Sequence, residues 1–246
     1  MPFPYLENSA EHAGSPINAV LFDYGMVLSQ PPDPAAWARI RAITGLDEPA
    51  LHAAYWQFRH DYDRGALTGP AYWQAVAAAT GITLDPGQLA GVLAADTDLW
   101  SSLNVPMVSW AGRLQHAGVR TGILSNIGDS MAAGIVAEFP WLAGFYHCTW
   151  SYALGMAKPD PAIYIETAEA LGAAPANILF LDDREDNIAA ALALGFPSIL
   201  YKIADHAAFE REMRERGYTS LLEAGLGANN SISADESLLR PEPARK

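Results

Sequence analysis

The stretch INAVLFDYGMVL (residues 17–28) decides what kind of fold this sequence can form. Residues 17–22 are an apolar run interrupted only by Asn18, and such a run predicts a buried strand. Strands that are apolar on both faces are typical of a parallel sheet covered by helices on either side. Asp23 follows the run at once, and a buried carboxylate is costly unless it has a partner. The stretch therefore predicts an α/β fold with a polar position at the end of its first strand.

Further strand-like runs and helical stretches alternate along the rest of the chain. The runs cover residues 119–124, 144–149, 177–181 and 198–201. The helical stretches cover residues 105–117, 129–137, 161–172 and 186–194. Alternation of this kind implies right-handed crossovers and a doubly wound parallel sheet.

The segment between the first two strands is different, because it shows no convincing strand. Helix starts and glycine breaks divide it into about four helices, with an expected aromatic core of Trp37, Tyr55, Trp56, Phe58, Tyr72 and Trp73. An insertion after the first strand lies over the carboxyl edge of the sheet, where open α/β sheets bind ligands. We therefore expect a catalytic core of residues 1–30 and 101–224, a helical cap of residues 31–100 and a polar tail of residues 225–246.

Composition and charge limit the classes of molecule that this protein is expected to bind. Half of the 246 residues are hydrophobic, 17% are charged, and the net charge is −13, so we expect no nucleic-acid-binding surface. Cys148 is the one cysteine, which precludes an internal disulfide and fits a reducing cytoplasm. We see no signal peptide and no apolar run near the ~20 residues of a membrane span. The oligomeric state stays open.

Polar residues gather at the predicted strand ends. They are Asp23, the pair Ser125 and Asn126, the pair Asp182 and Asp183, and Lys158 in a loop before a helix. A single Asp, Ser or Asn at such a place is also explained by turn or helix capping. Three carboxylates in one crevice, however, repel one another unless a cation lies among them, and oxygen ligands without His or Cys suit Mg²⁺. The group therefore indicates a magnesium site.

Lys158 indicates an anion-binding site beside the predicted magnesium site. The chain has only three lysines, and Pro159 keeps this one out of the helix that begins just after it. A cation at a helix N-terminus opposes the helix dipole unless an anion is held there, and N–H groups with an ammonium make a phosphate site. The alternative is a surface lysine paired with a nearby acid. With three acids close by, we favour the phosphate site.

With these residues in place, the chain resembles the haloacid dehalogenase superfamily of hydrolases that use an Asp nucleophile. The resemblance covers roughly residues 18–202 and rests on four motifs in order: LFDYGMVL (21–28), ILSN (123–126), GMAKPDPAIY (155–164) and FLDDREDNIAAALALGF (180–196). It implies a Rossmann-like core with a small helical cap. The branch that contains alpha-D-glucose-1-phosphate phosphatase is similar in a further respect, since it also has Gly two residues after the nucleophile.

The resemblance implies a Mg²⁺-dependent phosphatase of small phosphorylated metabolites, with sugar phosphates as the expected substrates. Asp23 would attack phosphorus and form an aspartyl-phosphate that water then hydrolyses. The implied metal site consists of Asp23, the carbonyl of Gly25, Asp183, Asp182 through water, and Asn187 as the residue that orients the acidic loop. The implied phosphoryl site consists of Ser125, Asn126 and Lys158.

Gly25 is the position at which this sequence departs from the pattern of the superfamily's phosphatases. Most phosphatases of the superfamily have a second Asp there, which protonates the leaving oxygen and activates water, a role worth about 10²–10⁴ in rate. Three readings follow. The substrate has a good leaving group such as an anomeric oxygen, another residue substitutes (Asp182, His60 or Arg64), or the protein is a catalytically weakened module that binds a phosphorylated ligand.

Two other classes share part of the pattern. A 2-haloacid dehalogenase also uses an Asp nucleophile, but the related enzymes need no metal and lack the acidic pair, so Asp182 and Asp183 argue against it. A receiver-type signalling domain has its acidic pair on the first strand and no helical insertion. The cap side chains that reach the substrate are harder to place, and we expect them to be His60, Tyr62 and Arg64.

Overall fold

A five-stranded parallel sheet organises the computed structural model, which describes residues 17–226. The strands are β1 (Ala19–Phe22), β2 (Arg120–Ser125), β3 (His147–Trp150), β4 (Ile178–Asp182) and β5 (Ser198–Leu200), in the spatial order β3-β2-β1-β4-β5. All five predicted runs form strands, and the doubly wound α/β fold is confirmed. The N-terminal residues in which we saw no signal peptide, and the predicted tail beyond residue 226, lie outside the described residues.

Strand β1 lies at the centre of the sheet and pairs with β2 on one side and β4 on the other. Phe22 is aligned with Ile123 of β2 and Leu181 of β4, so all three strands end at nearly the same level. The chain places β2 and β3 on one side of β1 before it crosses to β4 and β5 on the other. The carboxyl ends beside β1 are therefore the topological switch point, where folds of this class bind ligands.

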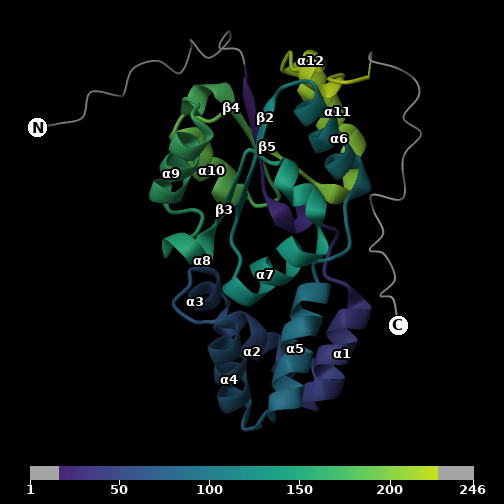
Figure 1. The fold of residues 1–246 in the computed structure, drawn as a ribbon, viewed down its shortest axis with the longest axis vertical. Helices are drawn as coiled ribbons and strands as arrows, with labels where there is room; N and C mark the ends of the chain where they lie inside the picture. Colours follow the sequence, from purple (N-terminus) through teal and green to yellow (C-terminus); the bar gives the residue numbers. More distant parts are fainter. Residues whose placement is uncertain (1–16, 227–246) are drawn as a thin grey trace, which may run out of the picture.

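Helices cover both faces of the sheet (Figure 1). One face packs on α9 (Pro161–Leu171) and α10 (Glu185–Ala193), and the other on α6 (Val105–His116), α7 (Asp129–Glu138), α11 (His206–Glu215) and α12 (Thr219–Leu222). The buried residues form one apolar cluster on each face. Shorter connecting helices are η1 (Tyr24–Leu28), η2 (Pro140–Gly144), α8 (Ser151–Leu154), η3 (Pro175–Asn177) and η4 (Ile203–Asp205).

The inserted segment forms a separate helical layer at the lower end of Figure 1. Its helices are α1 (Pro34–Thr44), α2 (Glu48–Gln57), α3 (Arg59–Asp63), α4 (Gly69–Thr80) and α5 (Pro86–Asp98). Asp33, Thr68 and Asp85 cap the helices that follow them, as the helix-start signals predict. The segment has five helices rather than about four, because the chain breaks at Phe58 between α2 and α3.

The expected aromatic core of the cap is correct except at one position. Tyr55, Tyr72 and Trp73 are fully buried, and Trp37 and Phe58 pack against them. Trp56, however, is 49% exposed, although its ring makes an edge contact with the buried Tyr55 ring at 5.1 Å. Its interpretation as a core residue was therefore wrong.

The cap and the core meet in a tight seam around α3. Tyr62 is completely buried, and its hydroxyl accepts a hydrogen bond of 3.2 Å from the backbone N–H of Met131 at the start of α7. The backbone at Gly128 lies against the Tyr62 ring, so a Cβ there would come within 2.1 Å of ring carbons. The Gly69 N–H donates to Asp129 at 2.8 Å. These contacts hold the cap over the carboxyl edge of the sheet. Within residues 17–226, no helix has the length and apolar character needed to cross a membrane.

Candidate active site

A cavity of about 240 Å³ lies between the carboxyl ends of the central strands and the cap. The core lines it with Asp23, Tyr24, Gly25, Met26, Ser125, Asn126, Ile127, Met131, Lys158, Asp183, Arg184 and Asn187, and the cap segment lines it with Trp56, Arg59, Asp63 and Trp100. Segments that are more than a hundred residues apart in the sequence thus share one cavity. All the predicted core site residues except Asp182 are on its wall, and Asp182 lies directly behind it.

Asp23 sits where β1 turns into η1. Its N–H donates to the Leu181 carbonyl at 2.8 Å and so continues the β1–β4 ladder by one residue. Its Oδ1 accepts from the N–H of Tyr24 at 2.7 Å. In the turn that follows, Met26 has φ = 60°, a left-handed conformation that costs energy for a side chain of this kind. The strand and the turn together fix the position of the Asp23 carboxylate at the cavity wall.

Lys158 reaches the same place from the loop before α9. Its Nζ lies 3.0 Å from Asp23 Oδ1 and 2.6 Å from Asp182 Oδ2, and the side chain is almost completely buried. Burial alone would lower the pKa of Lys158, but the two carboxylates outweigh it and raise the pKa above its ordinary value. The group therefore stays an ammonium beside Asp23.

Asp182 supports the cluster from behind. It is fully buried, and besides Lys158 it accepts from the Arg184 N–H at 2.9 Å and from Asn187 Nδ2 at 3.0 and 3.1 Å. Its two oxygens are thus engaged by protein donors. These bonds favour a role in orienting Lys158 and Asn187, whereas we predicted a metal contact through water. Its nearest oxygen nevertheless lies within 4.8 Å of oxygens of Asp23 and Asp183.

The three carboxylates outnumber the single ammonium. Burial raises the pKa of Asp23 to about 8, with further increases from Asp182 and Asp183, although Lys158 opposes the shift. Burial, and then Asp182, also raise the pKa of Asp183, although Lys158 opposes the shift. Such a group is strongly stabilised by a divalent cation, and an all-oxygen set of this kind is what Mg²⁺ prefers.

Asn187 adds a second observation in favour of a cation. Its Nδ2 is held by Asp182, and its Oδ1 is buried without a hydrogen-bond partner among residues 17–226. A buried amide oxygen needs a partner, and this one belongs to a residue on the cavity wall next to Asp183. Asp23, Asp183 and Asn187 therefore fit a hydrated Mg²⁺ ion.

Ser125 and Asn126 end β2 at the cavity. Ser125 is buried and lines the wall, as predicted. The Asn126 amide has a different partner from the predicted substrate: its Nδ2 donates to the Lys158 carbonyl at 2.8 Å and its Oδ1 accepts from the Lys158 N–H at 2.8 Å. The side chain of Asn126 thus fixes the loop that carries Lys158, because this reciprocal pair uses both of its polar atoms.

Gly25 supplies no acidic side chain two residues after Asp23. Its φ of −63° is accessible to any residue, and an added Cβ would meet the Trp100 ring at 3.5 Å, an ordinary contact. The glycine is therefore not needed by the backbone. An indole ring from the end of the cap segment occupies the space beside this position.

The structure places the predicted cap residues outside the cavity wall. His60 and Arg64 are exposed and do not line the cavity, and Arg64 pairs with Asp61 at the surface. Tyr62 is buried in the seam, since it stacks on Tyr72 at 4.7 Å. These residues point away because one face of α3 is turned to solvent and another to the seam.

The cap residues that line the cavity instead are Trp56, Arg59 and Asp63, together with Trp100. Trp56 comes from the last turn of α2, whereas Arg59 and Asp63 are spaced i and i+4 on α3, which places these two on one face of that helix. The i, i+4 spacing of Arg59 and Asp63 was the signal in the sequence that could have identified that pair.

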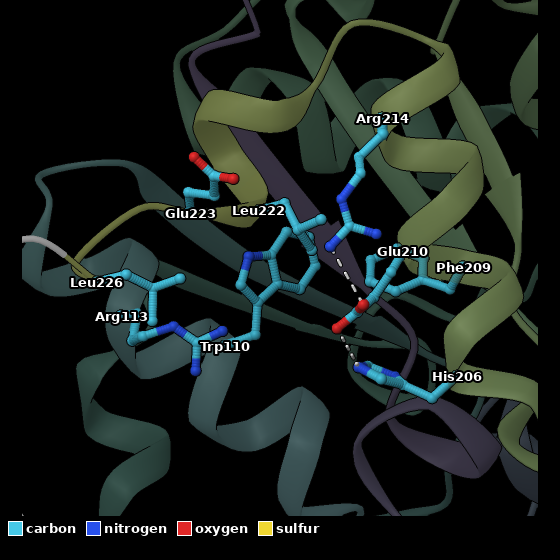
Figure 2. A pocket seen from close by; sticks show the side chains of 9 residues that line it. All are labelled: Trp110, Arg113, His206, Phe209, Glu210, Arg214, Leu222, Glu223 and Leu226. Atoms are coloured by element: carbon cyan, nitrogen blue, oxygen red, sulfur yellow. Dashed lines mark hydrogen bonds and ion pairs between the residues drawn. The ribbon is translucent and has the colours of Figure 1, made fainter.

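A second cavity of about 290 Å³ lies elsewhere, between α6, α11 and α12 (Figure 2). Trp110 is at its centre, and Glu210 forms an ion pair with Arg214 at 3.3 Å and lies 3.9 Å from His206, whose pKa is lowered by burial. It is lined by none of the residues at the strand ends. The chemistry indicated by the motifs therefore belongs to the first cavity.

Comparisons with known proteins agree with this geometry. The family model for haloacid dehalogenase-like hydrolases matches residues 17–195. Bifunctional epoxide hydrolase 2 of Sus scrofa is 28% identical over 212 residues, which are 80% of this chain and 38% of that protein. The same enzyme of Rattus norvegicus is 33% identical over 129 residues, 51% of this chain and 23% of that protein. The chain therefore spans less than two-fifths of these relatives.

Solved structures show the same fold. The HAD family enzyme bt-2542 from Bacteroides thetaiotaomicron superimposes with a TM-score of 0.67 at 20% identity, over 78% of this chain and 98% of that one. Its complex with magnesium and inorganic phosphate gives a TM-score of 0.63 at 21% identity, over 76% and 95% of the two chains. The L-2-haloacid dehalogenase RSc1362 gives 0.58 at 23% identity, over 75% and 86%. None of these comparisons addresses the glucose-1-phosphate phosphatase branch, which stays a prediction.

Proposed function

This chain belongs to the haloacid dehalogenase-like hydrolase family, and from that premise we propose that it is a Mg²⁺-dependent phosphatase of small phosphorylated metabolites, with sugar phosphates as the preferred class. One observation carries the proposal. Asp23, Asp183 and Lys158 come from three separate segments and line one cavity, with Asp23 3.0 Å from the Lys158 ammonium. That arrangement supplies a nucleophile, a metal ligand and a phosphate-binding cation.

The residues divide the chemistry among them. Asp23 attacks phosphorus and becomes an aspartyl-phosphate, which water then hydrolyses. Lys158 and Ser125 bind the phosphoryl oxygens, and Asn126 and Asp182 hold Lys158 in position. Mg²⁺ held by Asp23, Asp183 and the Gly25 carbonyl would neutralise charge on the transferring group.

Support for a metal-dependent phosphatase over a dehalogenase comes from the acidic group. A halide leaves without a metal, so a dehalogenase has no need of three carboxylates within 4.8 Å of one another. The complex of bt-2542 with magnesium and inorganic phosphate is consistent with this preference, although at 21% identity the likeness concerns the fold. The fold alone is shared with dehalogenases as well.

The lining of the cavity supports a sugar as the leaving group. Trp56 and Trp100 offer aromatic faces, while Arg59 and Asp63 offer a donor and an acceptor for hydroxyl groups. A small cavity with apolar faces and a few polar groups is typical of a metabolite site. A volume of about 240 Å³ suits a monosaccharide-sized group better than a nucleic acid or protein substrate.

The test is phosphate release from a panel of sugar phosphates, other phosphate monoesters and p-nitrophenyl phosphate, with and without a chelator, and with 2-chloropropionate as a dehalogenase substrate. We expect phosphate release that stops on chelation and returns with Mg²⁺. Activity that is insensitive to chelation would refute the metal assignment. Chloride release without phosphate release would replace the phosphatase by a dehalogenase, and binding of phosphorylated ligands without any turnover would leave a binding module.

A further inference from the structure

A buried charge cluster lies on the cavity side of the cap. Its centre is Arg59 of α3, whose Nε donates to Asp63 Oδ1 at 2.7 Å and whose guanidinium also bonds the Tyr55 hydroxyl. That hydroxyl donates to Asp96 Oδ1 at 2.8 Å, and Asp96 lies 3.7 Å from the guanidinium. The cluster thus joins two carboxyl groups through one cation and one phenol.

The charges in this cluster do not balance. Arg59 is its only cation among the described residues, and it faces both Asp63 and Asp96, all three being largely buried. Burial raises the pKa of each of the two carboxyl groups, and Arg59 only partly offsets the increase. Two buried carboxylates with one guanidinium would leave a net negative charge, and this imbalance favours a proton shared by the pair.

Of the two carboxyl groups, only that of Asp63 lines the active-site cavity. Its Oδ1 is bonded to Arg59, but no residue in the described part of the chain bonds its Oδ2. The backbone at this position is fixed to the core, because the Ser151 hydroxyl donates to the Asp63 carbonyl and accepts from the Ile127 N–H at 2.8 Å. Asp63 is therefore held over the core, with one oxygen free for a ligand.

The residues that the core contributes to the cavity wall leave the proton donor and acceptor of the reaction unassigned. Asp23 is the nucleophile, Lys158 is a buried ammonium, and Gly25 has no side chain. Phosphate transfer to Asp23 still leaves an alkoxide that needs a proton, and the second half of the reaction needs a base for water. Asp63 is the carboxyl group that the cap segment contributes to the wall of this cavity.

We propose that Asp63 is the general acid and base of this enzyme, acting from the cap in place of the side chain that Gly25 lacks. The inference rests on the phosphatase proposed above. As Asp23 Oδ attacks phosphorus, the bond to the leaving oxygen breaks, and that oxygen takes the proton of Asp63. Water then attacks the aspartyl-phosphate and gives a proton to the Asp63 carboxylate, which releases inorganic phosphate and restores both side chains.

The experiment compares Asp63→Asn with the wild type on two substrates in the presence of Mg²⁺. One is the best phosphate monoester of the panel with an alkoxide leaving group, and the other is p-nitrophenyl phosphate, whose leaving group departs as a stable anion. For the first, we expect kcat to fall by about 10²–10⁴. For the second, we expect a burst of one p-nitrophenolate per enzyme before slow turnover, because Asp23 is still phosphorylated but its hydrolysis has lost the base.

The matched control is Asp61→Asn, since it makes the same change on the same helix at an exposed carboxylate that pairs with Arg64. It should show neither effect. Equal losses on both substrates without a burst, or no loss, in Asp63→Asn would overturn the proposal. A wild type without Mg²⁺-dependent phosphate release would instead overturn the proposed function itself.

Because Asp63 is paired with Arg59, the Asn variant has to be checked for folding by its thermal unfolding. If it does not fold, Asp63→Glu answers the same question, since it keeps the charge of the pair but moves the carboxyl group by one methylene. We expect it to lose at least tenfold more activity on the alkoxide substrate than on p-nitrophenyl phosphate. Equal losses would overturn the proposal here too.

Discussion

The seam between cap and core offers the most direct test of how this structure holds its active site closed. Gly128 lies at the N-terminus of α7 with an ordinary φ of −83°, so an alanine there meets no backbone strain. Its Cβ, however, would lie 2.1 Å from two carbons of the Tyr62 ring, far inside contact distance. That ring has little freedom to move, because it is stacked on Tyr72 at 4.7 Å and bonded to the Met131 N–H.

Gly128→Ala therefore has to displace Tyr62 and with it the end of α3. Overpacking of this kind costs about 1–3 kcal/mol. In a chain of this size each kcal/mol lowers Tm by about 2–4 °C, so we expect a fall of about 4–8 °C for a cost near the middle of the range. Because α3 carries Arg59 and Asp63 on the cavity wall, kcat/KM for phosphate release should fall with it.

Two variants separate the clash from other effects of losing the glycine. Gly128→Ser has the same Cβ but supplies a favourable N-cap, so a capping effect would stabilise it whereas the clash destabilises it. Gly112→Ala adds a Cβ in helix α6 where no atom lies within 4 Å, and should raise Tm slightly. A Gly128→Ser protein that melts at or above the wild-type temperature would refute the reasoning about the seam.

Three further predictions concern the site itself. Asp23→Asn is expected to abolish phosphate release while Tm stays the same or rises, because the change relieves repulsion from Asp182 and Asp183; near-native kcat would show that the nucleophile lies elsewhere. Trp56→Ala should raise KM with little change in Tm, since this exposed ring lines the cavity outside the cap core; an unchanged KM would contradict this role. The pKa of Asp23 is raised from 3.8 to about 8, chiefly by burial. The folded, metal-free protein therefore binds the Asp23 proton more tightly than the unfolded chain does, and the free energy of unfolding should fall as pH rises between about 4 and 8. Tm measured in EDTA should accordingly be lower at pH 8 than at pH 5, with a smaller slope in Asp23→Asn, and a Tm that rises over this window would refute the assignment.

The core of the fold could be predicted because its signals are local. An apolar run of four to six residues followed by a polar residue marks a buried strand and its end, and Asp23, Ser125 and Asp182 are found at or just beyond the ends of β1, β2 and β4. Parallel strands bring their carboxyl ends to one edge whatever separates them in the sequence. The convergence of these residues on one edge of the sheet therefore followed from the order of the strands.

The partners of the polar side chains could not be predicted in this way. Asn126 bonds the backbone of Lys158, and Asp182 turns its oxygens to Lys158, Arg184 and Asn187. Such bonds depend on rotamers and on loops that meet only in the folded chain. Residue type and spacing indicated which groups come together, but not which oxygen remains free for a ligand.

The sequence alone determined the parallel sheet, the inserted cap and the set of polar residues at the strand ends. The reason is that hydrophobic periodicity is a local signal, and the order of strands and helices along the chain can be read directly from it. Only the tertiary structure decided which face of the cap looks into the cavity. Arg59 and Arg64 are both cap cations on or next to α3, yet the first is buried against Asp63 and the second is exposed. The docking of α3 against α7 and α8 sets that difference. The rotation of one short helix cannot be read from a segment that has polar residues on every side.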